Sequence, residues 1–172
     1  MCPAADPTTL TIPTTVRNAD ITVAALIEDA GRFLLVEEHA GGRAVFNQPA
    51  GHLEAGETLI QAVVRETLEE TGYGFEPTAV LGLYHWYSEP DDATFLRIAF
   101  CGEAQAPNSI PELDPVIITT HWLTREQVLA QQNRLRSPMV LRCIDDYRSG
   151  TRFPLSYLAE ACLEERLRQV GD

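Results

Sequence analysis

Runs of β-branched and aromatic residues alternate with polar, turn-forming segments over most of the chain, which is the pattern of strands. Six such runs are predicted to be strands: residues 21–27, 32–37, 43–48, 78–87, 93–101 and 117–123. The first two are separated by Glu28-Asp29-Ala30-Gly31, which suits a tight hairpin turn. Residues 49–56 are rich in proline and glycine, and residues 104–115 lack a clear period, so both are predicted to be loops.

A helical period replaces the strand pattern after the loop at 49–56. Thr58 and Gln61 form a capping-box signature and Gly72 supplies a stop signal, so a helix is predicted over residues 58–71. Its core-facing positions are predicted from the apolar residues that recur every four positions: Ile60, Val64 and Leu68.

The last third of the chain is predicted to be helical, over 124–132, from Ser137-Pro138 to Tyr147, and over 155–169. Ser137 and Pro138 suit the N-cap and the first position of the middle helix. Residues 1–18 are expected to form a loose N-terminal arm. Because there is no internal repeat and no linker, residues 19–172 are predicted to form one domain of mixed α/β (α+β) class, a sheet with flanking helices.

Composition excludes several functions. The chain has 172 residues, enough for a single core. Its 13 basic residues are all arginine, against 25 acidic residues, and the formal net charge is −12. Without lysine, neither a Walker A motif nor a Schiff base can form. The acidic balance argues against polymeric nucleic acid and membrane lipid as partners.

The expected location is the cytoplasm. No stretch approaches the ~18 apolar residues of a membrane span, and the N-terminal residues lack the pattern of a secretory signal. The four cysteines show no Cys-x-x-Cys spacing and are predicted to be free thiols: Cys2, Cys101, Cys143 and Cys162.

Three glutamates gather on one face of the predicted helix 58–71. Glu66, Glu69 and Glu70 are spaced by three and four positions, so their side chains are neighbours roughly 5–6 Å apart. Such like charges repel unless something offsets them, and a hard divalent cation is the usual compensation. Glu57 can fold back towards this face, and Arg65 is placed to orient a carboxylate. For an arbitrary acidic run, a solvated surface would be the simpler interpretation.

The wider pattern favours the metal. The sequence contains Gly-x5-Glu-x7-Arg-Glu-U-x-Glu-Glu-x-Gly-U, with U apolar, over residues 51–73. All seven fixed identities are present, with Thr67 and Tyr73 at the two apolar positions. Seven matches at fixed spacing arise by chance on the order of once in 10^8 positions. The chain therefore resembles the Nudix hydrolases.

That resemblance implies the Nudix fold, a mixed β-sheet sandwiched between helices, and hydrolysis of a phosphorus-containing acid anhydride. It also implies that Mg²⁺ or Mn²⁺ is held by Glu66, Glu69 and Glu70, with Glu57 in support and a backbone carbonyl of Ala50 or Gly51 in the coordination shell. A carboxylate outside the coordination shell can act as general base, and both Glu66 and Glu54 are candidates.

Segments outside the box resemble the NudJ-type branch of the same family. They are Phe46 to Glu54, Thr94-Phe95-Leu96-Arg97, Leu135-Arg136-Ser137-Pro138, Tyr147-Arg148-Ser149-Gly150 and Phe153-Pro154-Leu155. This resemblance implies release of orthophosphate from nucleoside tri- and diphosphates and from hydroxymethylpyrimidine diphosphate. The sequence departs from one feature of the family. Many Nudix enzymes carry an acidic residue six positions before the tryptophan of the last strand, and here that position, before Trp122, is Val116. Glu112 or Asp114 can substitute if the loop bends suitably.

Several further residues are candidates for substrate contact. Arg97 and Arg136 match phosphate oxygens, and Gln48 and His52 flank the glycine that opens the box. Structural ion pairs are the alternative for the arginines, Arg134 included. The aromatic residues Tyr84, Trp86 and Tyr87 can stack on a base or can belong to the core.

Two alternatives to a nucleoside tri- and diphosphatase stay open. One is a hydrolase of ADP-ribose, dinucleotides or diphosphate sugars, whose products include no orthophosphate. The other is a Nudix-fold sensor that binds a nucleotide without turnover, which loss of box glutamates would favour. The expected partner is a small nucleotide or diphosphate, and the chain is expected to be a monomer or a homodimer.

Overall fold

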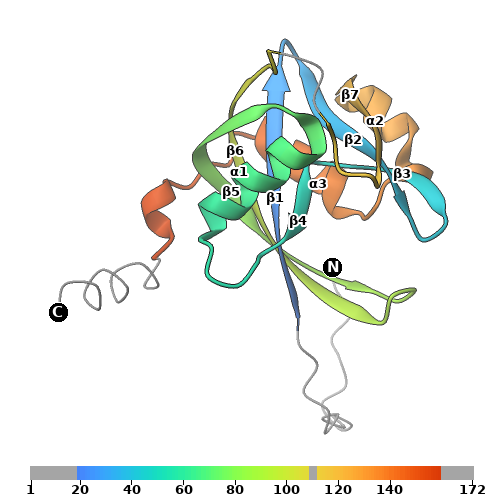
Figure 1. Ribbon diagram of the computed structural model, residues 1–172, viewed down its shortest axis with the longest axis horizontal. Coiled ribbons are helices and arrows are strands. Elements are labelled where there is room, and N and C mark those ends of the chain that lie inside the picture. The colour runs from blue at the N-terminus through green and yellow to red at the C-terminus, as the bar shows by residue number, and fades with distance from the viewer. Residues whose placement is uncertain (1–18, 109–111, 160–172) are drawn as a thin grey trace, which may run out of the picture.

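A computed structural model describes residues 19–108 and 112–159 (Figure 1). The predicted arm at 1–18 lies outside these residues, as do 109–111 and 160–172. Seven strands and three α-helices make up the described part: β1 (Asp20–Asp29), β2 (Arg32–Ala40), β3 (Arg43–Asn47), β4 (Ala50–His52), α1 (Leu59–Thr71), β5 (Gly74–Ser88), β6 (Ala93–Gln105), β7 (Ile117–Thr124), α2 (Arg125–Ala130) and α3 (Met139–Arg148).

All six predicted strands are confirmed, most of them longer than predicted, and β4 is an additional strand within the predicted loop 49–56. The β1–β2 hairpin has the expected tight turn, in which Ala30 and Gly31 adopt φ values of 48° and 81°. The second hairpin, β5–β6, is antiparallel along nearly its whole length and turns where Asp92 adopts a φ of 47°.

Strand β1 organises the sheet because it has different partners along its length. It runs parallel to β6 from Asp20 to Ile27 and is antiparallel to β2 at the hairpin end. Strand β2 pairs with β7 from Arg32 to Glu38 and with β3 from Val36 to Ala40, and the short strand β4 pairs with β1 at Thr22–Ala24. The segment between β3 and β4 therefore lies where the two halves of the sheet part.

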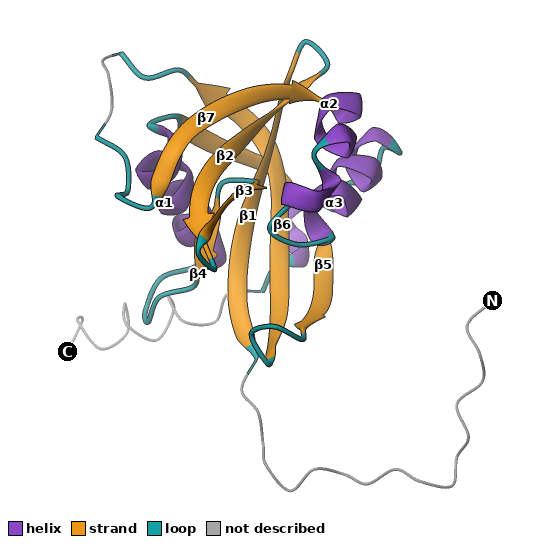
Figure 2. Cartoon of the chain, turned by 90° about the vertical axis from the view of Figure 1, so that its right-hand side faces the viewer, coloured by secondary structure: helices purple, strands orange, loops and turns teal. Residues whose placement is uncertain are grey.

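Helices cover both faces of the sheet, with α1 on one side and α2 and α3 on the other (Figure 2). Alternate residues of β1 point to opposite faces of the sheet. On one face, Ala24 and Leu26 belong to a core with Val140 and Ile144 of α3; on the other, the intervening residues pack with Val63 of α1. A strand buried on both faces reads as a continuous apolar run, which is what residues 21–27 show. The mixed α+β class predicted from the sequence is confirmed.

Helix α1 has the predicted ends but not the predicted buried face. Thr58 accepts a hydrogen bond from the Gln61 backbone, the Gln61 side chain closes the capping box, and Gly72 ends the helix in the left-handed conformation. The buried residues, however, are Ala62, Val63, Thr67, Glu70 and Thr71. Ile60 is partly buried and packs against the core, but Val64 is only partly buried and Leu68 is 53% exposed, so the predicted core stripe was wrong in its C-terminal part.

The hydroxyl groups of two threonines explain how a polar face can be buried. Thr67 donates to the Val63 carbonyl at 2.7 Å and Thr71 donates to the Thr67 carbonyl at 2.5 Å. Because both hydroxyls are satisfied within the helix, their methyl groups pack without leaving a polar atom unpaired. This frees α1 to turn Glu70 inwards.

The C-terminal helices differ from prediction in detail. Thr124 caps α2 through a second capping box with Gln127, but the helix ends at Ala130 and a 3-10 turn covers 132–134. Pro138 takes the N-cap position of α3 and the helix has no side-chain cap, so Ser137 does not act as the predicted cap. Of the predicted helix 155–169, the described residues show a 3-10 turn at Leu155–Tyr157.

Cys101 and Cys143 are buried free thiols, as predicted; the other two cysteines lie outside the described residues. Within 19–108 and 112–159, no helix is long and apolar enough to cross a membrane.

Candidate active site

The loop before α1 is held against both the sheet and the helix. Ala25 on β1 donates to the Pro49 carbonyl at 2.9 Å, and Leu53 donates to the Ile21 carbonyl at 3.1 Å. The Ala50 amide in turn donates to Glu70 Oε2 at 2.8 Å. These bonds bring the loop backbone to the face of α1 that carries the glutamates.

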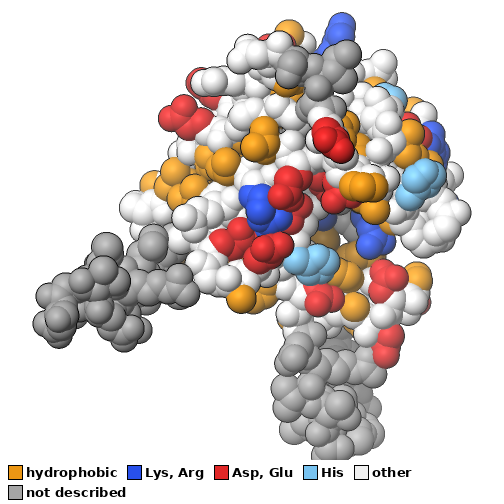
Figure 3. Space-filling view, in the orientation of Figure 1, with side chains coloured by type: hydrophobic (Ala, Val, Ile, Leu, Met, Phe, Trp, Pro, Cys, Tyr) orange, Lys and Arg blue, Asp and Glu red, His pale blue; other side chains and the backbone are white. Residues whose placement is uncertain are grey.

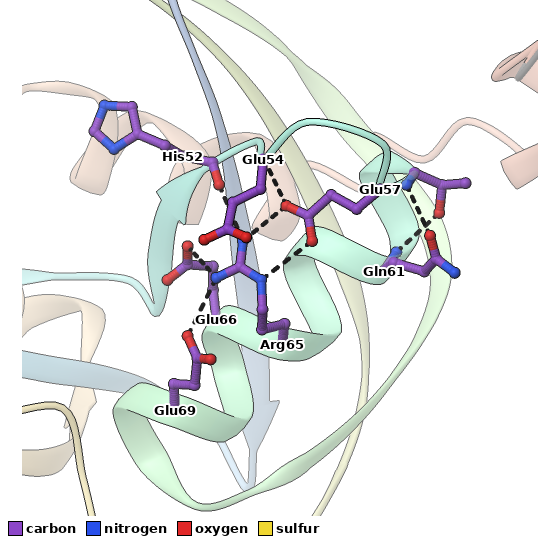
Figure 4. A network of polar contacts seen from close by, with 8 residues as sticks. His52, Glu54, Glu57, Gln61, Arg65, Glu66 and Glu69 are labelled. Carbon is purple, nitrogen blue, oxygen red and sulfur yellow. Dashed lines mark hydrogen bonds and ion pairs between the residues drawn. The ribbon is translucent and has the colours of Figure 1, made fainter. Parts of the chain in front are cut away.

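Arg65 is the centre of an ion-pair network on this face (Figure 4). Its guanidinium contacts Glu57 at 2.7 Å, Glu66 at 2.8 Å and Glu69 at 3.1 Å. It also donates to the His52 carbonyl at 3.1 Å. The hydrogen bond to Glu57 is the largest cause of a raised Arg65 pKa, and Arg65 in return lowers the pKa of Glu57. Arg65 thus orients carboxylates from the loop and the helix at once.

The carboxylate of Glu57 fixes the loop as well. Its Oε1 accepts a 2.7 Å hydrogen bond from the Glu54 amide, so one oxygen serves both the loop backbone and Arg65. Glu54 itself is exposed at the edge of the cavity described below.

Glu70 is buried, and the side chain of Glu66 is 13% exposed. Burial raises the pKa of Glu70 to about 9, against the lowering effect of the Ala50 amide, and the charges of Glu38, Glu66 and Asp114 raise it further. Burial also raises the pKa of Glu66, although Arg65 opposes it. Both groups would be more easily ionised beside an added positive charge.

The donor set fits a hard divalent cation. Carboxylate oxygens and backbone carbonyls are the ligands that Mg²⁺ takes, and a cation would offset the repulsion that raises the pKa of Glu70. Within the described residues, no three side chains of His, Cys, Asp or Glu are already grouped around one point. Arg65 instead spans Glu57, Glu66 and Glu69.

A cavity of about 370 Å³ opens beside these glutamates. Figure 3 shows acidic side chains gathered around a basic one, and next to them a hollow that contains basic and hydrophobic side chains. Eight of the sequence-predicted site residues line the cavity: Ala50, Gly51, His52, Glu54, Glu66, Glu70, Arg97 and Arg136. The remaining four, Gln48, Glu57, Arg65 and Glu69, are not among the residues that line it.

Gln48 supports Arg97 from behind. It is 1% exposed, its amide nitrogen donates to the Val140 carbonyl at 2.7 Å, and its oxygen accepts from Arg97 at 3.2 Å. Asn47 accepts a second bond from Arg97 at 3.3 Å. The structure therefore places Gln48 where it positions Arg97, rather than in the direct substrate contact expected from the sequence.

The two other arginine candidates, Arg134 and Arg136, have different surroundings. Arg134 pairs with Glu37 and lies over the Phe46 ring, 4.6 Å from its centroid, which favours the structural alternative. Arg136 faces the cavity, and its Nε lies 4.0 Å from Glu38 Oε1.

Of the aromatic candidates, Trp86 alone is among the residues that line this cavity, where its ring stacks on Phe95 at 5.5 Å. The Tyr84 hydroxyl donates to Asp146 at 3.1 Å, which ties β5 to α3.

Sequence reasoning missed Glu38. This residue ends the acidic pair of β2, beside a bulge in the pairing with β7, and its side chain is 12% exposed in the cavity wall. Burial raises its pKa, and Arg136 opposes the effect. The available signal was an acidic pair directly after a buried apolar run, where at least one carboxylate points inwards.

The loop before β7 does bend towards α1. The Asp114 amide donates to the Glu69 carbonyl at 2.9 Å, and the Asp114 charge contributes to the raised pKa values of Glu70 and Glu38. Val116, six positions before Trp122, is 47% exposed. Asp114 is therefore the nearby acidic group of this loop, although it does not line the cavity.

Comparison with known proteins agrees with this geometry. The family model of the NUDIX domain matches residues 17–143. The chain is 41% identical to Phosphatase NudJ of Escherichia coli K12 over 140 residues, which cover 81% of this chain and 90% of that protein. A NUDIX hydrolase structure from Nitrosomonas europaea superposes with a TM-score of 0.82 and 41% identity, covering 85% of this chain and 99% of that one.

A more distant structure shares the fold. The NUDIX domain of Shewanella oneidensis NrtR, complexed with ADP ribose, matches with a TM-score of 0.64 and 18% identity, covering 80% and 91% of the two chains.

Proposed function

The chain belongs to the NUDIX family and is a hydrolase of phosphorus-containing acid anhydrides, and from this premise we propose that it releases orthophosphate from nucleoside tri- and diphosphates with a divalent cation. Hydroxymethylpyrimidine diphosphate is proposed as a further substrate. The observation that carries the proposal is the cavity of about 370 Å³ that Glu66 and Glu70 line together with Arg97 and Arg136.

We assign the cation, Mg²⁺ or Mn²⁺, to Glu66, Glu69 and Glu70, with a backbone carbonyl of Ala50 or Gly51 in the same shell. When bound, the cation neutralises phosphate oxygens and lowers the pKa of a coordinated water. The two desolvated carboxylates supply the negative charge that holds it. Arg65 and Glu57 keep the loop and the helix at the spacing this requires.

For the general base, the geometry favours Glu54 over Glu66. Both line the cavity, but Glu66 already accepts a 2.8 Å hydrogen bond from Arg65 and belongs to the assigned cation ligands. Glu54 is exposed at the edge of the same cavity and is free of that assignment. A base contributes typically 10²–10⁴-fold to the rate, so Glu54→Gln is expected to lower kcat by that order with KM little changed.

On the substrate side, Arg97 and Arg136 are proposed to contact phosphate oxygens, with His52 at the rim. Arg97 is held by two neutral amides, and its Nε–H remains available to an anionic ligand. Residues 19–172 are proposed to act as one domain, in the cytoplasm, on small nucleotides; a monomer or a homodimer is expected.

The test is product analysis. Purified protein with Mg²⁺ is given ATP, ADP, hydroxymethylpyrimidine diphosphate and ADP-ribose, and orthophosphate, pyrophosphate and monophosphates are measured. Orthophosphate from the first three supports the proposal. Turnover of ADP-ribose alone, with two monophosphates as products, would assign the cavity to the dinucleotide class. Binding of a nucleotide without any turnover would indicate a sensor.

A further inference from the structure

The cavity beside the glutamates contains a set of buried polar atoms that make no hydrogen bond; one of them, Glu38 Oε1, has the 4.0 Å ion contact with Arg136. In the part of the chain that the structure describes, four buried side-chain atoms make no hydrogen bond: Thr22 Oγ1, Glu38 Oε1, Arg97 Nε and Ser137 Oγ. All four residues line this one cavity. A buried polar atom without a hydrogen-bond partner destabilises the fold, so four around one space point to a ligand that pairs with them.

These atoms lie at the closed end of the cavity. Thr22, Arg97 and Ser137 are 7%, 5% and 5% exposed, whereas His52 and Glu54 are exposed and mark its mouth. Thr22 and Arg97 are direct partners in the parallel pairing of β1 with β6 and so share one face of the sheet. Ser137 precedes α3 and is free for the cavity because it does not cap that helix.

The positive charges at the closed end favour an anionic ligand. Arg97 is fixed by the side-chain oxygens of Asn47 and Gln48, and Gln48 is itself anchored to the Val140 carbonyl. Both hydrogen-bonding partners of the guanidinium are neutral amides, the charges of Glu38 and Glu70 also act on it, and its Nε–H remains available to a ligand. Arg136 adds a second positive charge to the same wall.

The hydrogen-bonding pattern narrows the kind of anion. Two hydroxyls and the Arg97 Nε–H can donate, while Glu38 Oε1 can only accept when ionised. A terminal phosphate offers several acceptor oxygens and, with a second pKa near 6, one oxygen that carries a proton in part of the population at neutral pH. A phosphate esterified on both sides carries no such proton.

We propose that the closed end of this cavity is a subsite for a terminal phosphate group, bound by Thr22, Arg97 and Ser137, with Glu38 accepting from its P–OH. The proposal rests on the proposed function, since Glu66 and Glu70 on α1 must hold the rest of the diphosphate through the cation. Hydrolysis of the bond that joins this phosphate to the remainder releases orthophosphate, whichever phosphorus is attacked. The nucleoside then lies outside the subsite.

The first experiment compares ADP with ADP-ribose, which share adenosine diphosphate but differ in whether the β-phosphate is terminal. The expected kcat/KM for ADP exceeds that for ADP-ribose by on the order of 100-fold, because several charge-assisted hydrogen bonds are lost with the free end. Ser137→Ala and the isosteric Thr22→Val are each expected to lower kcat/KM for ADP about 10-fold, with ADP-ribose little affected. Equal loss on both substrates would overturn the subsite.

The second experiment measures binding directly, by calorimetry with inorganic phosphate in Mg²⁺ buffer. Ser137→Ala and Thr22→Val should each weaken phosphate binding about 10-fold, and thermal unfolding verifies that each variant is folded. Ser156→Ala, at an exposed serine outside the cavity, is the matched control and should bind like wild type. Unchanged affinity in both cavity variants would overturn the proposal.

The two experiments distinguish a failure of the subsite from a failure of the proposed function. If no substrate is hydrolysed but the cavity variants weaken phosphate binding, the subsite stands and the proposed function falls. If orthophosphate is released but the variants bind phosphate normally, the function stands and the subsite falls. CTP and UTP differ only along the N3–C4 edge of the base. A CTP-to-UTP ratio of kcat/KM that changes about 10-fold in Glu38→Gln would place the base at Glu38 and overturn the phosphate assignment.

Discussion

The carboxylate of Glu66 on α1 lies directly over the α-carbon of Gly51 in β4. A Cβ atom at residue 51 would stand 2.1 Å from the carboxyl carbon of Glu66, closer than atoms can approach. The glycine that opens the box is therefore required by close contact with the helix, not by an unusual φ. It lets the loop backbone and the Glu66 carboxylate share one wall of the cavity.

Gly51→Ala should consequently reduce activity far more than stability. The atoms in the way belong to the end of a flexible side chain, so Glu66 can swing aside at little cost to the fold, but it then leaves its position. We expect kcat/KM to fall about 10–100-fold, as when groups that support a metal site are displaced. Steady-state kinetics and thermal unfolding measure the two effects.

Gly74→Ala is the matched control, because the added Cβ would meet only Gln105 Cβ at an ordinary 3.8 Å. Near-normal turnover in Gly51→Ala would show that Glu66 can move without consequence, against its assignment as a ligand.

Glu70→Gln tests the cation from the side of stability. With a pKa of about 9, the Glu70 carboxyl is mostly neutral at pH 7 in the metal-free protein, so its replacement by a neutral amide should leave that protein about as stable as wild type. A cation at 100 times its Kd stabilises a folded protein by about 2.7 kcal/mol, and this gain on adding Mg²⁺ should be largely lost in the variant together with most activity.

Thermal unfolding with and without Mg²⁺ provides the readout. Glu76→Gln, at an exposed position of β5, should keep the full Mg²⁺ effect. A wild-type Mg²⁺ shift in Glu70→Gln would remove Glu70 from the ligand set.

Much of this site could be anticipated from sequence because its signals are local. The ends of α1 follow from Thr58, Gln61 and Gly72, each of which acts within one turn of the helix. The buried face of α1, in contrast, is decided by tertiary contacts. Glu70 lies on the inner side of the helix, where it accepts a hydrogen bond from the Ala50 amide, and Leu68 is left on the surface.

The closed end of the cavity could not be anticipated in the same way. Glu38, Arg97 and Ser137 come from three distant segments and meet only because β1 parts from β2 and α3 packs on the far face of the sheet. Ser137 shows the limit of local reasoning. A serine before proline suits a helix cap, yet its hydroxyl makes no hydrogen bond to the helix and the residue lines the cavity instead.

Glu37 should contribute acid-sensitive stability. The hydrogen bond with His121, and then Arg134, lowers its pKa below the usual value of 4.5. A group whose folded pKa is lowered stabilises the fold above its unfolded pKa and loses that contribution as the pH falls through the folded pKa. Glu37→Gln should therefore cost about 1 kcal/mol above pH ~5, and the difference from wild type should shrink below pH ~4.

Denaturant unfolding across this pH range measures the difference. Arg134→Gln and the double variant complete a cycle, and the two single losses should not add, since both remove one interaction. A difference that is constant with pH would mean that the Glu37 carboxylate is not the group responsible.

Gln48→Met separates a positioning residue from one that contacts substrate. Methionine fills a similar volume but leaves Arg97 without one acceptor and the Val140 carbonyl without its donor. Loss of a buried partner costs about 1–3 kcal/mol, so stability should fall by roughly 2 kcal/mol. Since Arg97 then loses one of two fixed partners, KM for ADP should rise more than kcat falls.

Gln105→Met, at an exposed position of β6, is the control for the side-chain change itself. Lowered stability with an unchanged KM for ADP would show that Asn47 alone positions Arg97. If KM for ADP stays at the wild-type value in both Gln48→Met and Ser137→Ala, this end of the cavity does not recognise the substrate.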